Sequence, residues 1–119
     1  MALIEVGGCV YDEEQLGLSR GYEELDAVGR EAFVNHMHID SEDREAEAAR
    51  VVGAWAAEMQ ARWPGRVFRI YRVVEPDEVT VRFHLVRLGV HNWWDGEGVE
   101  VITVGSPDAE LAAATDGGA

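Results

Sequence analysis

The sequence predicts an α+β fold: a mostly antiparallel sheet with a C-terminal β-meander, and one long helix packed on one face. Three observations predict it. Residues 66–88 have the pattern of a β-hairpin, residues 42–63 that of an amphipathic helix, and residues 99–104 form a further β-branched run. The length suits a single domain, which we expect to span residues 1–105, with a frayed tail at 106–119.

The expected hairpin consists of two β-branched and aromatic runs on either side of the turn residues 75–78. Pro76 suits the first corner of a type I turn because its φ is already near the required value. If Val74 pairs with Val79, antiparallel geometry determines every other pair of the hairpin.

Alternation along the two strands separates an apolar face from a polar one. The apolar face carries Phe68, Ile70, Val74, Val79, Val81, Phe83 and Leu85. The polar face carries Arg69, Tyr71, Thr80, Arg82 and His84. Arg69 then opposes His84 and Tyr71 opposes Arg82, so that a guanidinium can lie over the tyrosine ring. We interpret this polar face as the candidate binding surface.

The N-terminal segment predicts a short strand at residues 2–6, which Gly7 and Gly8 end in a turn or bulge. Residues 9–11 can continue this strand. The polar segment 12–20 is expected to be a loop.

A short helix is expected at residues 22–30, where apolar positions recur at helical spacing. Residues 32–39 are ambiguous, because the helix could continue through them, but their alternation favours a strand. A strand would place His36 and His38 on the same face.

The long helix is expected at residues 42–63, capped by Asp40 or Ser41 and ended by Pro64 and Gly65. Its apolar stripe comprises Ala48, Val52, Trp55, Met59 and Arg62 or Trp63. Trp55 and Met59 should therefore pack on the apolar face of the hairpin.

A glycine-rich connection at residues 89–98 carries Trp93 and Trp94. These side chains either cover the end of the core or form part of a recognition surface, since tryptophan is enriched where proteins bind one another.

The net charge of −13 argues against general binding to nucleic acid or to anionic membranes. The basic residues are concentrated, because six of the ten arginines lie between residues 62 and 88, beside three acids. This locally positive segment could receive an acidic ligand or pair with the acidic residues of the protein's own helices.

A lone cysteine, Cys9, excludes an intramolecular disulfide, and the N-terminus lacks the basic flank and apolar run of a signal peptide. The apolar stretches are too short to span a bilayer. We therefore expect a cytoplasmic protein.

Metal binding is expected to need the pair His36 and His38, because two imidazoles at i and i+2 of a strand can bind one divalent ion. Further ligands could come from Asp40, Glu42, His84 and His91. We favour the other interpretation, in which these histidines are solvent-facing or hydrogen-bonded and no cofactor is bound, and metal binding is the alternative.

Two classes of function remain, and the sequence does not decide whether the protein is an enzyme. The favoured class is a non-enzymatic interaction domain of regulatory or inhibitor type, steered to a basic protein partner, with Trp93 and Trp94 anchoring contact. The alternative is a small enzyme or ligand-binding domain in which Arg69 and Arg82 hold an anion beside Tyr71 and His84. A homo-oligomer is compatible with either class.

Overall fold

The computed structural model describes residues 2–105, so the tail expected at 106–119 lies outside the described residues. The elements of the first half are β1 (Leu3–Val6), β2 (Cys9–Asp12), α1 (Glu13–Leu18), the 3-10 turn η1 (Tyr22–Glu24), α2 (Ala27–Val34) and β3 (Met37–Ile39). Those of the second half are α3 (Arg44–Arg62), β4 (Phe68–Val74), β5 (Val79–Leu85) and β6 (Glu100–Val104).

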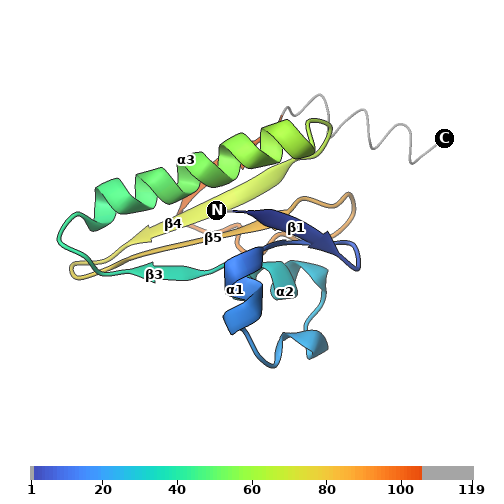
Figure 1. Cartoon of the computed structure of the whole chain (residues 1–119), viewed down its shortest axis with the longest axis horizontal. Coiled ribbons are helices and arrows are strands. Elements are labelled where there is room, and N and C mark those ends of the chain that lie inside the picture. Colours follow the sequence, from blue (N-terminus) through green and yellow to red (C-terminus); the bar gives the residue numbers. More distant parts are fainter. Residues whose placement is uncertain (1, 106–119) are drawn as a thin grey trace.

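The expected α+β class is confirmed. An antiparallel sheet has the strand order β3-β5-β4-β6, and α3 lies across one of its faces (Figure 1). The hairpin register is also confirmed, with Val74 opposite Val79 and Phe68 opposite Leu85. Val74 is nevertheless 51% exposed instead of belonging to the core, because β4 ends there beside the turn.

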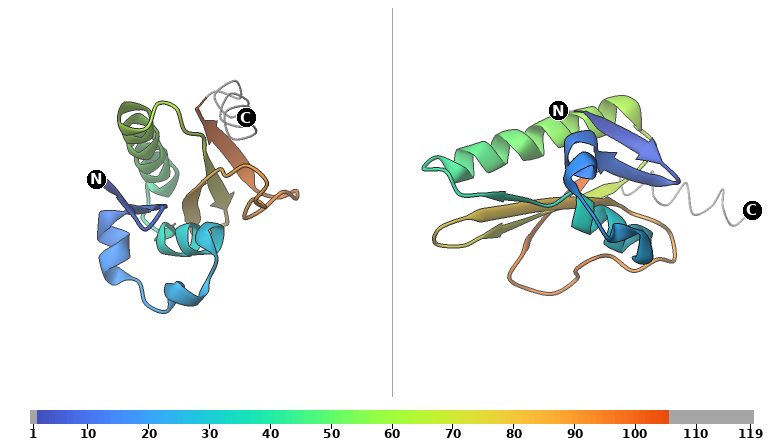
Figure 2. Two further views of the ribbon diagram at one scale, coloured as in Figure 1. Left: turned by 90° about the vertical axis from the view of Figure 1, so that its right-hand side faces the viewer. Right: turned by 60° about the horizontal axis from the view of Figure 1, so that its bottom comes forward.

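The expected β-meander is wrong. In a meander β6 would lie beside β5, but it pairs with β4, with Phe68 opposite Val104. The first half of β5 is already paired with β3, where Val81 lies opposite Met37. The connection at 86–99 therefore passes across the face of the sheet opposite α3 before β6 begins (Figure 2).

The main core lies between α3 and the apolar face of the hairpin. Trp55 packs edge-on against Phe83, with 4.8 Å between the ring centroids, and both side chains are fully buried. The buried residues of α3 are Ala48, Val51, Trp55 and Met59. Val51 thus takes the central position expected for Val52, which packs at the margin of the core. The helix begins at Arg44 after Asp43, so the expected caps Asp40 and Ser41 are wrong.

The first twenty residues hold a second hairpin and a helix where we expected one strand and a loop. Gly7 and Gly8 both have positive φ (59° and 82°), which closes a tight turn between β1 and β2. The Asp12 carboxylate then accepts hydrogen bonds from the Glu14 and Gln15 amides (3.1 and 3.3 Å), which caps α1 within the expected loop.

The helix expected at residues 22–30 is divided into η1 and α2. Asp26 caps α2 by accepting from the Gly29 amide at 2.7 Å. The helix continues to Val34, because the Asn35 amide still donates a helical hydrogen bond to the Glu31 backbone carbonyl. The strand expected from residue 32 therefore begins only at Met37.

Two polar side chains, Glu31 of α2 and Asn35 directly after it, join β2 to the second half of β5. Asn35 accepts from the Asp12 amide (2.8 Å) and donates to the Val10 and Phe83 carbonyls (3.0 and 3.4 Å). Glu31 accepts from the backbone amides of both strands and is fully buried. These side chains provide hydrogen-bond partners for backbone amides and carbonyls of β2 and β5 that have no partner strand at these positions.

Substitution by alanine should change the free energy of unfolding in opposite directions at two glycines. Gly105 has φ of 105°, and a Cβ there would lie 2.6 Å from the Arg66 carbonyl oxygen, so Gly105→Ala should lower the free energy of unfolding by at least about 1 kcal/mol. Gly53 lies inside α3 with open space around its Cα, so Gly53→Ala should raise it by about 0.5–1 kcal/mol. Urea titrations measure both. Equal effects of the two substitutions would contradict this backbone conformation.

Candidate functional site

The polar face of β4 and β5 is covered by the connection at 86–99 and is not an open surface. Tyr71 and His84 are fully buried. Trp93 packs edge-on against Tyr71 (5.0 Å between ring centroids), and the Arg82 guanidinium lies 4.2 Å above the Trp93 ring. The arginine that contacts the Tyr71 ring is Arg69, at 5.5 Å from the ring centroid, and not Arg82, which the register placed opposite Tyr71 and which lies over Trp93 instead.

Hydrogen bonds determine the tautomer of His84. Its Nδ1 lies 3.0 Å from the Leu85 carbonyl oxygen, and a carbonyl can only accept, so Nδ1 carries the proton. Nε2 then accepts from the Tyr71 hydroxyl (2.8 Å) and from the Trp93 amide (3.3 Å). The neutral imidazole is therefore fully satisfied, and a second proton on Nε2 would face the Trp93 amide, which can only donate.

Burial changes the acid-base properties of this cluster. It lowers the pKa of His84 below its ordinary value, and the positive charges of Arg69 and Arg87 lower that pKa further. Burial also raises the pKa of Tyr71. Both groups therefore stay neutral near pH 7, as structural hydrogen-bonding groups do.

The depressed pKa of His84 predicts a pH dependence of stability. Unfolded His84 takes up a proton near pH 6.5, whereas folded His84 resists it, so its stabilising contribution is complete above that pH and is lost as pH falls toward the folded pKa. The slope from this residue is at most about 1.4 kcal/mol per pH unit.

We expect His84→Gln to flatten the fall in unfolding free energy between pH 7 and 5 in urea titrations. His91→Gln is the matched control, because the hydrogen bond from exposed His91 to Asp26 raises the pKa of His91 and acts in the opposite direction. If the unfolding free energy of the His84 variant depends on pH in the same way as that of the wild-type protein, His84 is not held neutral in the folded state.

The arginines of the positive segment pair mostly with acids of the same chain. Five of the six do so: Arg62 with Glu58, Arg66 with Glu5, Arg69 with Asp95, Arg72 with Glu100 and Arg87 with Glu31. Only two of these acids lie on helices, so the expected pairing with acidic helices holds in part. Among the described residues, Arg82 makes no ion pair and instead donates to the Ala32 carbonyl.

The two adjacent tryptophans have different positions. Trp93 is half-buried over the polar face of the sheet, whereas Trp94 is 43% exposed. A ligand held jointly by Arg69, Arg82 and His84 would therefore have to displace Trp93. The predicted binding role of these residues stays a prediction that requires this movement.

An acidic surface lies at the end of the molecule where α3 begins and the β4–β5 turn projects (Figure 1). Arg44 connects the two segments by donating to the Pro76 carbonyl at 2.7 Å. Residues 40–47 and 75–78 contain eight acids and Arg44 as their one basic residue. We call these two segments the acidic end. Its exposed acids are Asp40, Glu42, Asp43, Glu45, Glu75 and Asp77.

His36 and His38 lie side by side, with 5.2 Å between ring centroids in an edge-on arrangement. His36 uses Nδ1 to contact the Phe33 carbonyl, and His38 Nδ1 lies 3.1 Å from the Thr80 hydroxyl. Within residues 2–105, no three or more histidine, cysteine or acidic side chains gather as a metal would require. The expected metal role would therefore need further ligands from water or another molecule.

The two other histidines expected as metal ligands make contacts elsewhere, whereas Asp40 and Glu42 are exposed at the acidic end. His84 is enclosed under Trp93, and His91 is paired with Asp26 at 2.7 Å. Both histidines engage both ring nitrogens.

Sequence reasoning missed Glu31 and Asn35, which join β2 to β5, and the pocket beside His36 that α1 helps to form. The signal for Asn35 was its position on the apolar side of the expected strand. Within residues 2–105, no helix combines the length and the apolar character needed to cross a membrane. Comparisons with protein-family models, curated proteins and solved structures found no match to this chain, so its function has to be inferred from its own geometry.

Proposed function

We propose that this protein is a non-enzymatic interaction domain of regulatory or inhibitor type, whose acidic end binds a basic surface of another protein. The observation that carries the proposal is the distribution of charge. The arginines of the sheet are largely neutralised by acids of the same chain, whereas eight acids with Arg44 as their one basic neighbour in these segments make one end of the molecule strongly acidic.

Charge of this kind favours association with a basic partner by steering its approach. Val74, half-exposed beside the acidic turn, adds an apolar contact to this surface. The closed state of the Tyr71 and His84 cluster supports a binding function over a catalytic one, because its groups are bonded to one another. The proposal includes a cytoplasmic location, with which the single free cysteine, Cys9, is compatible.

The test compares two variants of equal net charge. The first neutralises the acidic end with Asp43→Asn, Glu45→Gln and Asp77→Asn. The control neutralises exposed acids elsewhere with Glu23→Gln, Glu24→Gln and Glu97→Gln. A partner captured from source cells by the wild-type protein is purified, and its Kd is measured for all three proteins at several salt concentrations.

We expect the acidic-end variant to bind about tenfold to a hundredfold more weakly, since three charge contacts at a hydrated surface contribute roughly 1–3 kcal/mol. The control should retain nearly wild-type affinity, and salt should weaken wild-type binding most. Equal affinity of the two variants would show that the partner does not use the acidic end.

A further inference from the structure

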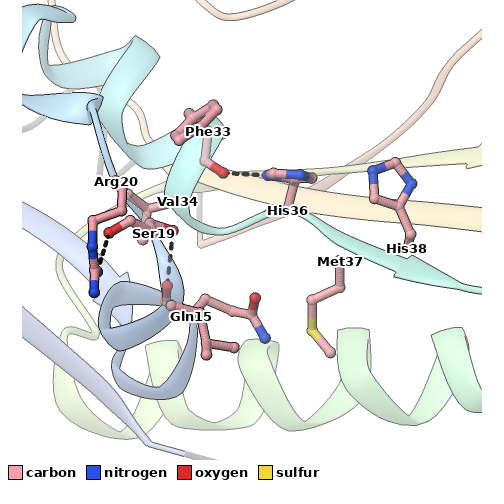
Figure 3. A pocket seen from close by; sticks show the side chains of 9 residues that line it. Gln15, Ser19, Arg20, Phe33, Val34, His36, Met37 and His38 are labelled. Carbon is pink, nitrogen blue, oxygen red and sulfur yellow. Dashed lines mark hydrogen bonds between the residues drawn. The ribbon is translucent and has the colours of Figure 1, made fainter.

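A pocket of about 370 Å³ lies between α1, the segment that follows it, the end of α2 and strand β3. Figure 3 shows Gln15 and Ser19 on one side of it and His36 and Met37 on the other. This volume falls within the range of small-molecule sites in proteins. The pocket does not include the Tyr71 and His84 cluster, and it adjoins the acidic end at His38, whose Nδ1 lies 3.4 Å from the Glu78 carboxylate.

Part of the pocket is apolar. Leu18, Phe33, Val34 and Met37 line it, and Leu18 and Phe33 are 73% and 40% exposed. Large apolar side chains that are exposed around a concavity favour an apolar ligand, because binding removes the apolar surface of the ligand and that of the side chains from water.

The charged and titratable groups of the pocket are all basic. Arg20, His36 and His38 line it, and none of the described lining residues is acidic, in a chain with 23 acids and 10 arginines. Gln15 and Ser19 supply neutral polar groups. A lining of this composition favours an anion, since charge-assisted hydrogen bonds to a carboxylate are stronger than neutral ones.

The two histidines of the pocket also differ from the other two in the chain. His84 and His91 each engage both ring nitrogens. His36 and His38 engage only Nδ1, which in His38 lies near both the Thr80 hydroxyl and the Glu78 carboxylate (3.1 and 3.4 Å), and neither Nε2 makes a hydrogen bond within the described part of the chain. Two imidazole nitrogens therefore remain for a ligand, at the end of the pocket away from Arg20 (Figure 3).

We propose that this pocket binds a small carboxylate with an apolar body. The carboxylate is held by Arg20 or by the imidazoles of His36 and His38, and the hydrocarbon covers Leu18, Phe33 and Met37. An inorganic anion would leave the apolar side chains exposed, and a neutral hydrocarbon would leave the basic groups without a partner. The ligand chemistry is thus that of a medium-chain or aromatic carboxylic acid.

The test is a titration of the full chain, followed by two-dimensional amide NMR, with three probes: octanoate, octan-1-ol as its neutral counterpart, and inorganic phosphate. We expect octanoate to bind saturably and to shift the amides of residues 15–20 and 33–38. Octan-1-ol should bind at least tenfold more weakly, and phosphate should not saturate at comparable concentrations.

Variants then identify the groups involved. Combined Arg20→Gln and His36→Gln substitution should weaken octanoate binding about tenfold or more, as expected for the loss of charge-assisted hydrogen bonds. Arg50→Gln on the exposed side of α3 is the matched control and should leave the Kd unchanged. Leu18→Ala should weaken octanoate and octan-1-ol alike, because both lose the same apolar contact.

Three results would overturn the proposal. They are equal affinity for octanoate and octan-1-ol, saturation by phosphate alone, and octanoate shifts centred outside residues 15–20 and 33–38. None of these results bears on the acidic end, and failure of the partner test leaves the pocket proposal unaffected.

Discussion

Glu31→Ala is expected to lower the free energy of unfolding by about 3–5 kcal/mol, the cost typical of breaking a buried ion pair by removing one partner. The Glu31 carboxylate is fully buried and accepts from the Val10 amide (2.7 Å), the Leu85 amide (3.1 Å) and Arg87 Nη1 (2.6 Å). Its removal leaves two backbone donors without their acceptor and leaves the Arg87 guanidinium with only the Leu85 and Gly8 carbonyls. Since a domain is stable by only about 5–15 kcal/mol, this is a large fraction of the total.

Urea titration at pH 7 measures the effect, and Glu5→Ala is the control. Glu5 also pairs with an arginine, Arg66, at 2.9 Å, but both side chains are more than a third exposed, so its loss should cost less than about 1 kcal/mol. If the two substitutions cost the same, Glu31 does not join β2 to β5.

Trp55→Ala is expected to cost a similar amount, about 3–5 kcal/mol, because it opens a large cavity between α3 and the sheet. The Trp55 side chain is fully buried and packs on Phe83. Its Nε1 also donates to Asp12 Oδ2 at 2.9 Å, while the other oxygen of Asp12 caps α1. The substitution therefore removes core volume and leaves a buried carboxylate short of one donor.

Trp55→Phe gives more weight to the second effect, because it keeps most of the apolar area but removes the donor together with the smaller ring of the indole. We expect it to cost about 1–3 kcal/mol, the penalty of one unsatisfied buried polar group. Urea titration of both variants, with Arg50→Ala on the exposed side of α3 as control, measures the difference. A cost for Trp55→Phe no larger than that of the control would mean that the contact with Asp12 contributes nothing.

The parts of the fold that depend on local pattern could be predicted from the sequence. The hairpin register follows from two β-branched runs around Pro76, and Trp55 and Met59 follow from helical periodicity. The position of β6 does not follow, because a strand after a long connection can join either edge of a hairpin. That choice depends on β3, whose pairing with β5 leaves the edge of β4 open.

The candidate site could be predicted only in outline. Alternation correctly grouped Arg69, Tyr71, Arg82 and His84 on one face, but it says nothing about what covers that face. Trp93 does so from a segment without periodicity. Glu31 likewise resembles an ordinary helical acid, and only the approach of β2 and β5 makes it a buried acceptor.

The central claim is that the polar face of the hairpin is a closed structural cluster, which is why we propose binding at the acidic end. The most direct test is long-range proton–nitrogen NMR of the His84 imidazole between pH 5 and 8. A neutral ring with its proton on Nδ1 throughout the neutral range, titrating only below the ordinary histidine pKa, is the expected result. Titration at the ordinary value, or a proton on Nε2, would mean that His84 is open to solvent or ligand and would contradict the claim.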